Sequence, residues 1–505
     1  MKITYTKYLT AAITLGTLAI TGCGGGGGSS SSQPGTSSEN LSANKILSSG
    51  EHQILAAKIR SNSMKTLVAW KTLTSTDYSY LYKAEKEDGV WHYPSGSNDY
   101  LERYKDAFPF LSWFDTEIHI SMNGTGNAII VNNMIRKLKN TNSLVSRISV
   151  TQYKDHEWKP GFFIDPYGGQ AVFPSVAMDQ NNNAIITWTG SADNNTLDFN
   201  NVNPYKAMYI NGIWNVPVDN NDHIGLDGGG KVGFFTTVNY RNNNAFITWF
   251  QQEDNTTSAP MRLYESDYSH GTFSFWIKPK KDESLSKNVM LHMPFSLPVK
   301  TAMDDQGNKL IVWLASDMNE IMHLYTAEYC NNMWHTPHSQ QDHIDNTYTK
   351  APITGDFPLT DIAANGNGFS IVTWSQYDND GKHIYARRYY LDNCTSVLSD
   401  SDTALNHGTD GKSDSPHVAV NNNNEGALIW VQEYQNKKRL YLATYENDNW
   451  HIPAPSQYIG GKDHNVSEIG LDIAINDNGE ITTVWTEYSD SNHSTLYMKE
   501  LQLNY

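Results

Sequence analysis

Residues 301–317 read TAMDDQGNKLIVWLASD, and related versions of this stretch recur along the chain. A polar turn, Asp304–Asn308, separates a short run from the β-rich apolar run Lys309–Ala315. Asp and Asn side chains can accept hydrogen bonds from the backbone two residues on, and Gly or Asn tolerates the positive φ of a tight turn. The stretch therefore predicts a β-hairpin whose acids stabilise the turn.

The tryptophan of this hairpin recurs at regular spacing. Its copies are Trp70, Trp188, Trp249, Trp313, Trp374, Trp430 and Trp485. The gaps after Trp188 are 61, 64, 61, 56 and 55 residues, and the gap of 118 before it equals two periods of 59. A further repeat fits into that gap with Asn132 at the Trp position. A fixed period of this length, here in eight units, is typical of repeat architectures.

Two more strands follow each hairpin. Tyrosines four residues apart, such as Tyr325 and Tyr329, mark a third strand with both rings on one face, and a second tryptophan such as Trp334 marks a fourth. Four short strands per unit without helical periodicity resemble a β-propeller. The resemblance covers residues 50–505 and implies an all-β propeller of about eight four-stranded blades, or seven blades plus an atypical unit. No single propeller family matches the repeat.

The two ends of the repeat region complement each other. After residues 495–505 the last unit has no fourth strand, whereas residues 41–48 precede the first unit and have no place in it. Pairing a strand from one terminus with the blade at the other would remove an exposed sheet edge. We therefore expect residues 41–48, within the segment 24–50, to close the ring. Residues 51–505 would form the propeller.

The N-terminus has the features of an export signal. Lys2 and Lys7 precede the apolar run Leu9–Ile20, which is too short to span a bilayer. The following ITGC (Ile20–Cys23) resembles the lipobox of bacterial lipoproteins, which implies that Cys23 is lipidated after residues 1–22 are removed; a plain secretory signal is the alternative. Gly24 favours the outer membrane, in a periplasmic or surface-exposed position. Residues 24–40, rich in Gly and Ser, predict a flexible tether.

Composition excludes several partners and chemistries. A net charge of -17 and a pI near 5.4 argue against nucleic acid and against a membrane surface, apart from the N-terminal lipid. Nucleophile elbows, phosphate loops and zinc helix motifs are missing from the sequence, so we predict no catalytic residues and no cofactor. His335 and His338 lie an odd number of residues apart, so with His343 they predict no metal site. Cys330 and Cys394 would either form a disulfide or remain free thiols, and the divergence of blade rims favours the free thiols.

One loop face gathers recurring polar residues. Two residues after the repeat tryptophan, at the end of the second strand, an amide or acid recurs, with tyrosines beside it. The connection between blades reaches the same face and carries a recurring Asp-His pair. The predicted ligand-binding residues are Gln251, Gln376, Gln432, Glu487, Tyr377, Tyr488, Asp222, His223, Asp342, His343, Asp463 and His464. Duplication of loop residues without any ligand is the alternative interpretation.

These observations favour a lipid-anchored envelope or cell-surface protein that binds a glycan or a protein through one propeller face. A periplasmic or outer-membrane assembly scaffold is a second hypothesis. A propeller glycosidase or lyase is a third, and it would need two carboxylates about 5–9.5 Å apart, with Glu487 as one of them. The absence of catalytic motifs favours binding over catalysis.

Overall fold

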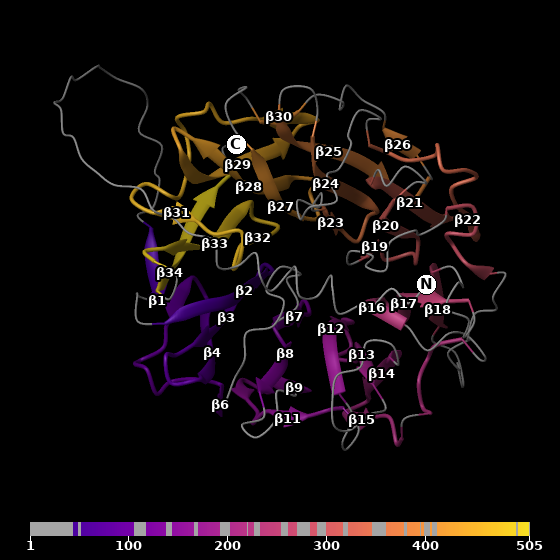
Figure 1. Cartoon of the computed structure of the whole chain (residues 1–505), viewed down its shortest axis with the longest axis horizontal. Coiled ribbons are helices and arrows are strands. Elements are labelled where there is room, and N and C mark those ends of the chain that lie inside the picture. The colour runs from indigo at the N-terminus through magenta and orange to yellow at the C-terminus, as the bar shows by residue number, and fades with distance from the viewer. Residues whose placement is uncertain are drawn as a thin grey trace, which may run out of the picture.

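The computed structural model describes residues 44–503 apart from 49–51, 106–117, 138–143, 166–169, 192–201, 220, 227–232, 254–260, 270–282, 290–298, 317–321, 346–359, 378–380, 394, 398–403, 407–411 and 491–492. Every regular element in this part of the chain is a β-strand. The strands form eight antiparallel sheets arranged as the blades of a propeller, and the chain passes through them in order around the ring (Figure 1). The predicted fold and the count of eight blades are confirmed.

The first four blades contain the following strands. Blade 1 has β2 (Gln53–Ser61), β3 (Lys65–Leu73), β4 (Tyr78–Glu87), β5 (Val90–His92) and β6 (Glu102–Lys105), which pairs with β4. Blade 2 has β7 (Ile118–Met122), β8 (Ala128–Lys137), β9 (Leu144–Lys154), β10 (Glu157–Trp158) and β11 (Phe162–Phe163). Blade 3 has β12 (Gln170–Met178), β13 (Ala184–Ser191), β14 (Val202–Ile210) and β15 (Ile213–Asn215). Blade 4 has β16 (Gly233–Arg241), β17 (Asn244–Gln252) and β18 (Met261–Ser269).

The other four blades complete the ring. Blade 5 has β19 (Lys300–Met303), β20 (Lys309–Ser316), β21 (Met322–Cys330) and β22 (Met333–His335). Blade 6 has β23 (Thr360–Ala364), β24 (Phe369–Tyr377), β25 (Lys382–Tyr390) and β26 (Thr395–Val397), and blade 7 has β27 (Ser413–Val420), β28 (Gly426–Tyr434), β29 (Lys437–Glu446) and β30 (Asn449–His451). Blade 8 has β31 (Asn465–Val466), β32 (Asp472–Ile475), β33 (Glu480–Tyr488), β34 (Ser494–Gln502) and β1 (Lys45–Ser48).

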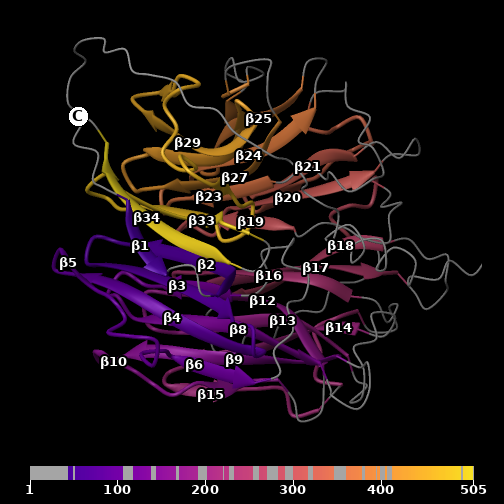
Figure 2. The same cartoon turned by 60° about the vertical axis from the view of Figure 1, so that its left-hand side comes forward.

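The strand β1 closes the ring, as the unmatched ends of the repeat region led us to expect. It pairs antiparallel with β34, with Lys45 opposite Met498 and Ile46 opposite Tyr497. Figure 2 shows the first and last parts of the chain side by side at this junction. Leu47 packs against a core shared by blades 1 and 8, so the closing strand also covers apolar surface. The signal, Cys23 and the tether lie outside the described residues, and no helix in the described part is long and apolar enough to cross a membrane.

The repeat aromatics hold each blade together. The tryptophan of the second strand lies directly opposite a tyrosine of the third strand, as Trp313 does opposite Tyr325. All seven such pairs have ring centroids 5.6–6.3 Å apart, and six of them are stacked. The second tyrosine contacts the second tryptophan, with 5.3 Å between the Tyr329 and Trp334 centroids. These residues form the cores between sheets, which is the packing role predicted for them.

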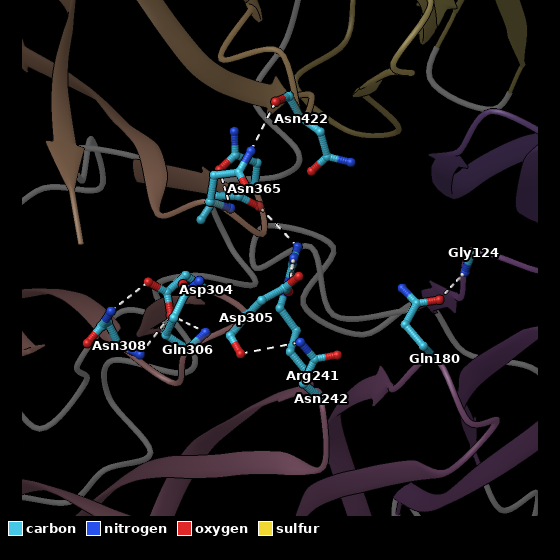
Figure 3. A network of polar contacts seen from close by, with 12 residues as sticks. Gly124, Gln180, Arg241, Asn242, Asp304, Asp305, Gln306, Asn308, Asn365 and Asn422 are labelled. Atoms are coloured by element: carbon cyan, nitrogen blue, oxygen red, sulfur yellow. Dashed lines mark hydrogen bonds and ion pairs between the residues drawn. The ribbon is translucent and has the colours of Figure 1, made fainter. Parts of the chain in front are cut away.

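An acid or amide stabilises the turn of most of the hairpins. Asp304 is fully buried, and its Oδ1 accepts hydrogen bonds from the backbone N–H groups of Gln306 (3.0 Å) and Asn308 (2.8 Å). Asn365 does the same for Asn367 and Phe369, both at 3.0 Å, which confirms the predicted turn chemistry. The turns also bond across blades, and Figure 3 shows part of this network. Asn365 Nδ2, for example, donates to the Asn421 carbonyl at 2.9 Å, so the turns join neighbouring blades as well as closing hairpins.

Candidate functional site

The central channel receives one polar side chain from each blade. Each of these residues pairs across its hairpin with the residue just before the repeat tryptophan, or before Asn132 in blade 2, so the sheet register sets them at one level. They all line a single cavity of about 630 Å³ formed by the innermost strands of all eight blades. We call them the channel ring: Lys58, His119, Ser175, Thr237, Lys300, Asp361, His417 and Asp472.

Part of the ring satisfies backbone groups of the next blade. The innermost strand of a blade is a sheet edge, so some of its N–H groups have no strand partner. Ring side chains accept from such groups in three places: Ser175 Oγ from Val238 (3.3 Å), Asp361 Oδ2 from Val418 (3.2 Å) and Asp472 Oδ2 from Ile59 (2.9 Å). Polar residues at this level therefore help to join adjacent blades along the channel.

The strongest electrostatic contacts of the ring centre on Asp361. Lys300 Nζ lies 3.2 Å from its Oδ1, and His417 Nδ1 lies 3.7 Å from its Oδ2. Burial alone would raise the pKa of Asp361, but Lys300, His417 and Lys58, together with the Val418 N–H, lower its pKa below the usual value. Asp361 is therefore ionised at neutral pH and is surrounded by two lysines and one imidazole from three other blades.

Basic and acidic side chains are nearly balanced in the channel, whose lining holds four lysines and arginines and five aspartates. Arg60, two residues beyond Lys58 on β2, lies 3.3 Å from Asp472 through its Nη1. Three basic side chains, Lys58, Lys300 and Arg60, therefore stand with two carboxylates, and the ring adds two imidazoles. This balance contrasts with the net charge of -17 for the whole chain.

The acids nearer the turn end of the channel are engaged in contacts of their own. Asp305 Oδ1 lies 3.1 Å from Arg241 Nη1 (Figure 3). Asp477 accepts two hydrogen bonds from Asn422, each of 3.0 Å. The charge of Asp305 is therefore offset by Arg241, whereas Asp477 keeps its negative charge and is held by amide donors.

The sequence analysis missed the channel ring, although a signal for it is present. In every repeat the ring residue lies 12 or 13 positions before the tryptophan, or before Asn132 in the second repeat. All eight of these positions are polar and lie in or beside short apolar strands. A polar residue repeated at one place in an otherwise apolar strand indicates a shared environment, which here is the channel.

The predicted amides and acid beside the repeat tryptophan have a different environment from the one expected. Gln251, Gln376, Gln432 and Glu487 are buried, with exposed fractions of 1%, 4%, 4% and 5%. In each, Oε1 accepts the indole N–H of the tryptophan two residues earlier, at 2.9–3.1 Å. Oε1 of Gln251 and of Glu487 also accepts from the backbone of Leu226 and Gly461. These side chains are therefore part of the buried interior of their blades, and their ligand role remains a prediction.

The other residues of the predicted loop face are more accessible. Tyr377 and Tyr488 are partly exposed, and burial raises the pKa of Tyr488. Asp222, Asp342, Asp463 and His464 are exposed, while His223 and His343 are partly exposed. Asp342 accepts the His338 N–H at 2.7 Å, which stabilises its own loop. A ligand role for these residues remains a prediction.

The histidines and cysteines near blade 5 depart from the sequence analysis. His335 and His338 are exposed, whereas His343 lies against His323 and Asp345. The hydrogen bond that His343 donates to Asp345 raises the pKa of His343, and the two histidines, opposing the effect of burial, lower the pKa of Asp345. Cys330 is buried and disulfide-bonded, so it is not the free thiol that we favoured; Cys394 lies outside the described residues.

Comparisons with known proteins find similarity at the level of solved structures. No family model matches the chain, and no curated protein matches it. An ulvan lyase described as a new polysaccharide lyase family has a TM-score of 0.45 at 9% identity, over 91% of this chain and 96% of that one. A Hadza microbial sialidase has a TM-score of 0.38 at 10% identity, over 85% and 74% of the two chains. A fucose-specific lectin from Aleuria aurantia has a TM-score of 0.33 at 11% identity, over 68% and 93%.

Proposed function

We propose that this protein binds an acidic glycan in its central channel. The observation that carries the proposal is the channel ring, in which eight blades bring polar side chains to one level of a cavity of about 630 Å³. That volume lies within the range of about 300–1,000 Å³ that is usual for ligand sites. The two lysines of the channel ring favour a ligand that carries carboxylate or sulfate groups, because such a ligand pairs with Lys58 and Lys300.

The channel offers groups suited to a sugar chain. Hydroxyls of Ser121, Ser175, Thr237 and Thr301 and the amide of Asn239 line the same cavity as the basic groups. Hydroxyl and amide groups both donate and accept hydrogen bonds, as the hydroxyls of a sugar require. Binding needs no nucleophile and no cofactor, which agrees with the absence of catalytic motifs from the sequence.

Binding to oligosaccharides of different charge tests this proposal. The chain from residue 41 onward should bind uronate-containing or sulfated oligosaccharides more tightly than neutral ones, and the affinity should fall as salt rises. Lys58→Met and Lys300→Met should each weaken acidic ligands by about tenfold or more, because a charge-assisted hydrogen bond is lost. Lys159→Met, which changes an exposed lysine paired with Glu157 on the outer part of blade 2, is the control.

Urea unfolding of the same variants shows whether the channel stays folded. Equal affinity of the two channel variants and the wild type for every acidic oligosaccharide would refute a channel site. If binding instead depends on Tyr377, Tyr488 or the Asp-His pairs, the ligand lies on the predicted loop face.

The proposal also includes a lipid anchor and an envelope location. It is supported by the basic start, the short apolar run and the lipobox-like ITGC of residues 20–23. A tether of about 17 residues, 24–40, would span roughly 20–25 Å as a flexible coil. Cys23→Ser should move the protein from the membrane fraction to the soluble fraction, and unchanged partitioning into detergent would exclude the anchor.

A further inference from the structure

Blade 5 carries a cluster of two imidazoles and one carboxylate outside the channel. His323 Nδ1 lies 2.9 Å from Asp345 Oδ2, and His343 Nδ1 lies 3.2 Å from Asp345 Oδ1. The two imidazole rings are stacked with centroids 4.0 Å apart. All three side chains are less than a tenth exposed. His323 belongs to β21, whereas His343 and Asp345 follow β22, so the fold of the blade brings them together.

Blade 3 contains the same loop without the cluster. The segment Asp342–Asp345 reads DHID, and the corresponding segment Asp222–Gly225 reads DHIG. Both loops make the same backbone bond to the third strand: Ile344 N–H donates to Leu324 at 2.8 Å, and Ile224 N–H donates to Pro204 at 2.9 Å. In blade 3, Asn203 and Gly225 take the places of His323 and Asp345. The loop therefore forms without the added imidazole and carboxylate.

One carboxylate oxygen of Asp345, Oδ1, has a structural role. It accepts the Leu324 N–H at 2.7 Å, a group that blade 3 lacks because Pro204 stands there. Asn406 Oδ1 accepts the Ile384 N–H in the same way in blade 6, at 2.9 Å, and Asn406 Nδ2 lies 3.0 Å from His383 Nδ1. An amide and one imidazole are thus enough for this role. In blade 2 an aspartate has this role beside a single cation, since Asp165 Oδ1 accepts the Ile148 N–H at 2.9 Å and the carboxylate pairs with Arg147. Blade 5 differs in placing two imidazoles on one carboxylate.

We propose that His323, His343 and Asp345 form a binding site for a zinc-type divalent transition metal. One ligand atom from each residue lies within 4.8 Å of the others. Ligands at about 2.0–2.1 Å from a tetrahedral zinc lie roughly 3.4 Å from one another, so small side-chain rotations bring these three into range. Imidazole nitrogen and carboxylate oxygen suit Zn²⁺, and water would complete a tetrahedral site. The carboxylate also offsets half of the charge of the ion inside a nearly buried cluster.

Zinc binding to the untagged full chain tests the site. After treatment with a chelator and dialysis, isothermal titration with Zn²⁺ should show one tight site per chain, and zinc should raise the melting temperature. His343→Asn and His323→Asn, the second of which copies blade 3, should weaken zinc binding at least about tenfold. Asp345→Asn should weaken it too while keeping the bond to the Leu324 N–H. His223→Asn changes the matching histidine of blade 3 and should leave zinc affinity unchanged.

Melting in chelator separates loss of the metal site from loss of the fold. Variants that melt like the wild type in chelator but gain no stability from zinc support the site. The proposal fails if the wild type binds no zinc, or if His323→Asn and His343→Asn bind it as tightly as the wild type. Equal loss of affinity in His223→Asn would also overturn it, because the ion would then bind to loop histidines in general.

Discussion

Replacing Gln432 with Met should destabilise the propeller by about 1–3 kcal/mol, because it leaves the Trp430 indole N–H buried without an acceptor. Gln432 is 4% exposed, and its Oε1 lies 3.1 Å from Trp430 Nε1. Met has nearly the volume of Gln, so the change removes the hydrogen bond without opening a large cavity. The stability of the folded state, rather than the binding of a ligand, is therefore the first property that should change.

A double-mutant cycle isolates this hydrogen bond. In a Trp430→Phe background there is no indole N–H to satisfy, so Gln432→Met should cost much less than in the wild type. The expected coupling energy is about 1–2 kcal/mol. The free energy of unfolding is best measured by urea titration followed by far-ultraviolet circular dichroism, because the second mutation changes the tryptophan fluorescence.

Blade 5 provides a natural comparison. There Ala315 stands two residues after the tryptophan, and the buried Nε1 of Trp313 has no hydrogen-bond partner among the described residues. Trp313→Phe should therefore cost about 1 kcal/mol less than Trp430→Phe. If Gln432→Met costs the same in both backgrounds, or if the two Trp→Phe changes are equally costly, the indole hydrogen bond does not stabilise the blade as we argue.

Three other predictions address closure, turns and pH. Deleting residues 45–48 should expose the edge of β34 and cause unfolding or aggregation. Deleting residues 24–38 should leave the melting temperature nearly unchanged. Equal tolerance of both deletions would show that β1 does not close the ring. Asp304→Ala should lower the free energy of unfolding in urea by about 2 kcal/mol, because the N–H groups of the turn lose their acceptor. Asp304→Asn keeps Oδ1 and should lower it less. Equal losses of stability would contradict the turn role. Burial raises the pKa of Glu265 from 4.5 to about 7 despite nearby Lys309. Between these two pKa values the native state holds a proton that the unfolded state has released. The contribution of Glu265 to the free energy of unfolding should therefore fall by up to about 1.4 kcal/mol for each pH unit as the pH rises from 4.5 to 7. Unfolding of Glu265→Gln across this range should lack that fall, and parallel curves would refute the assignment.

The burial of the amides beside the repeat tryptophan could have been predicted from the sequence. Residues two apart on a strand point to the same face. A glutamine two residues after a buried tryptophan therefore shares the face of the indole, as Gln376 does with Trp374. The strand-end position suggested exposure, but the alternation of the strand was the stronger constraint, and it favours a hydrogen bond to the indole.

The sequence by itself determined the repeat, the four-strand unit, the turn acids and the origin of the closing strand, while the structure decided for eight blades over seven plus an atypical unit. These features depend on turn chemistry and strand alternation, which act over a few residues and are then repeated along the chain. The tertiary structure alone decided which polar residues meet. Asp361 contacts Lys300 and His417 from neighbouring blades, and His343 reaches His323 only because β22 and its loop fold back over β21. Such contacts join residues about 20–60 positions apart, and their geometry follows from sheet register and ring closure, which no local pattern contains.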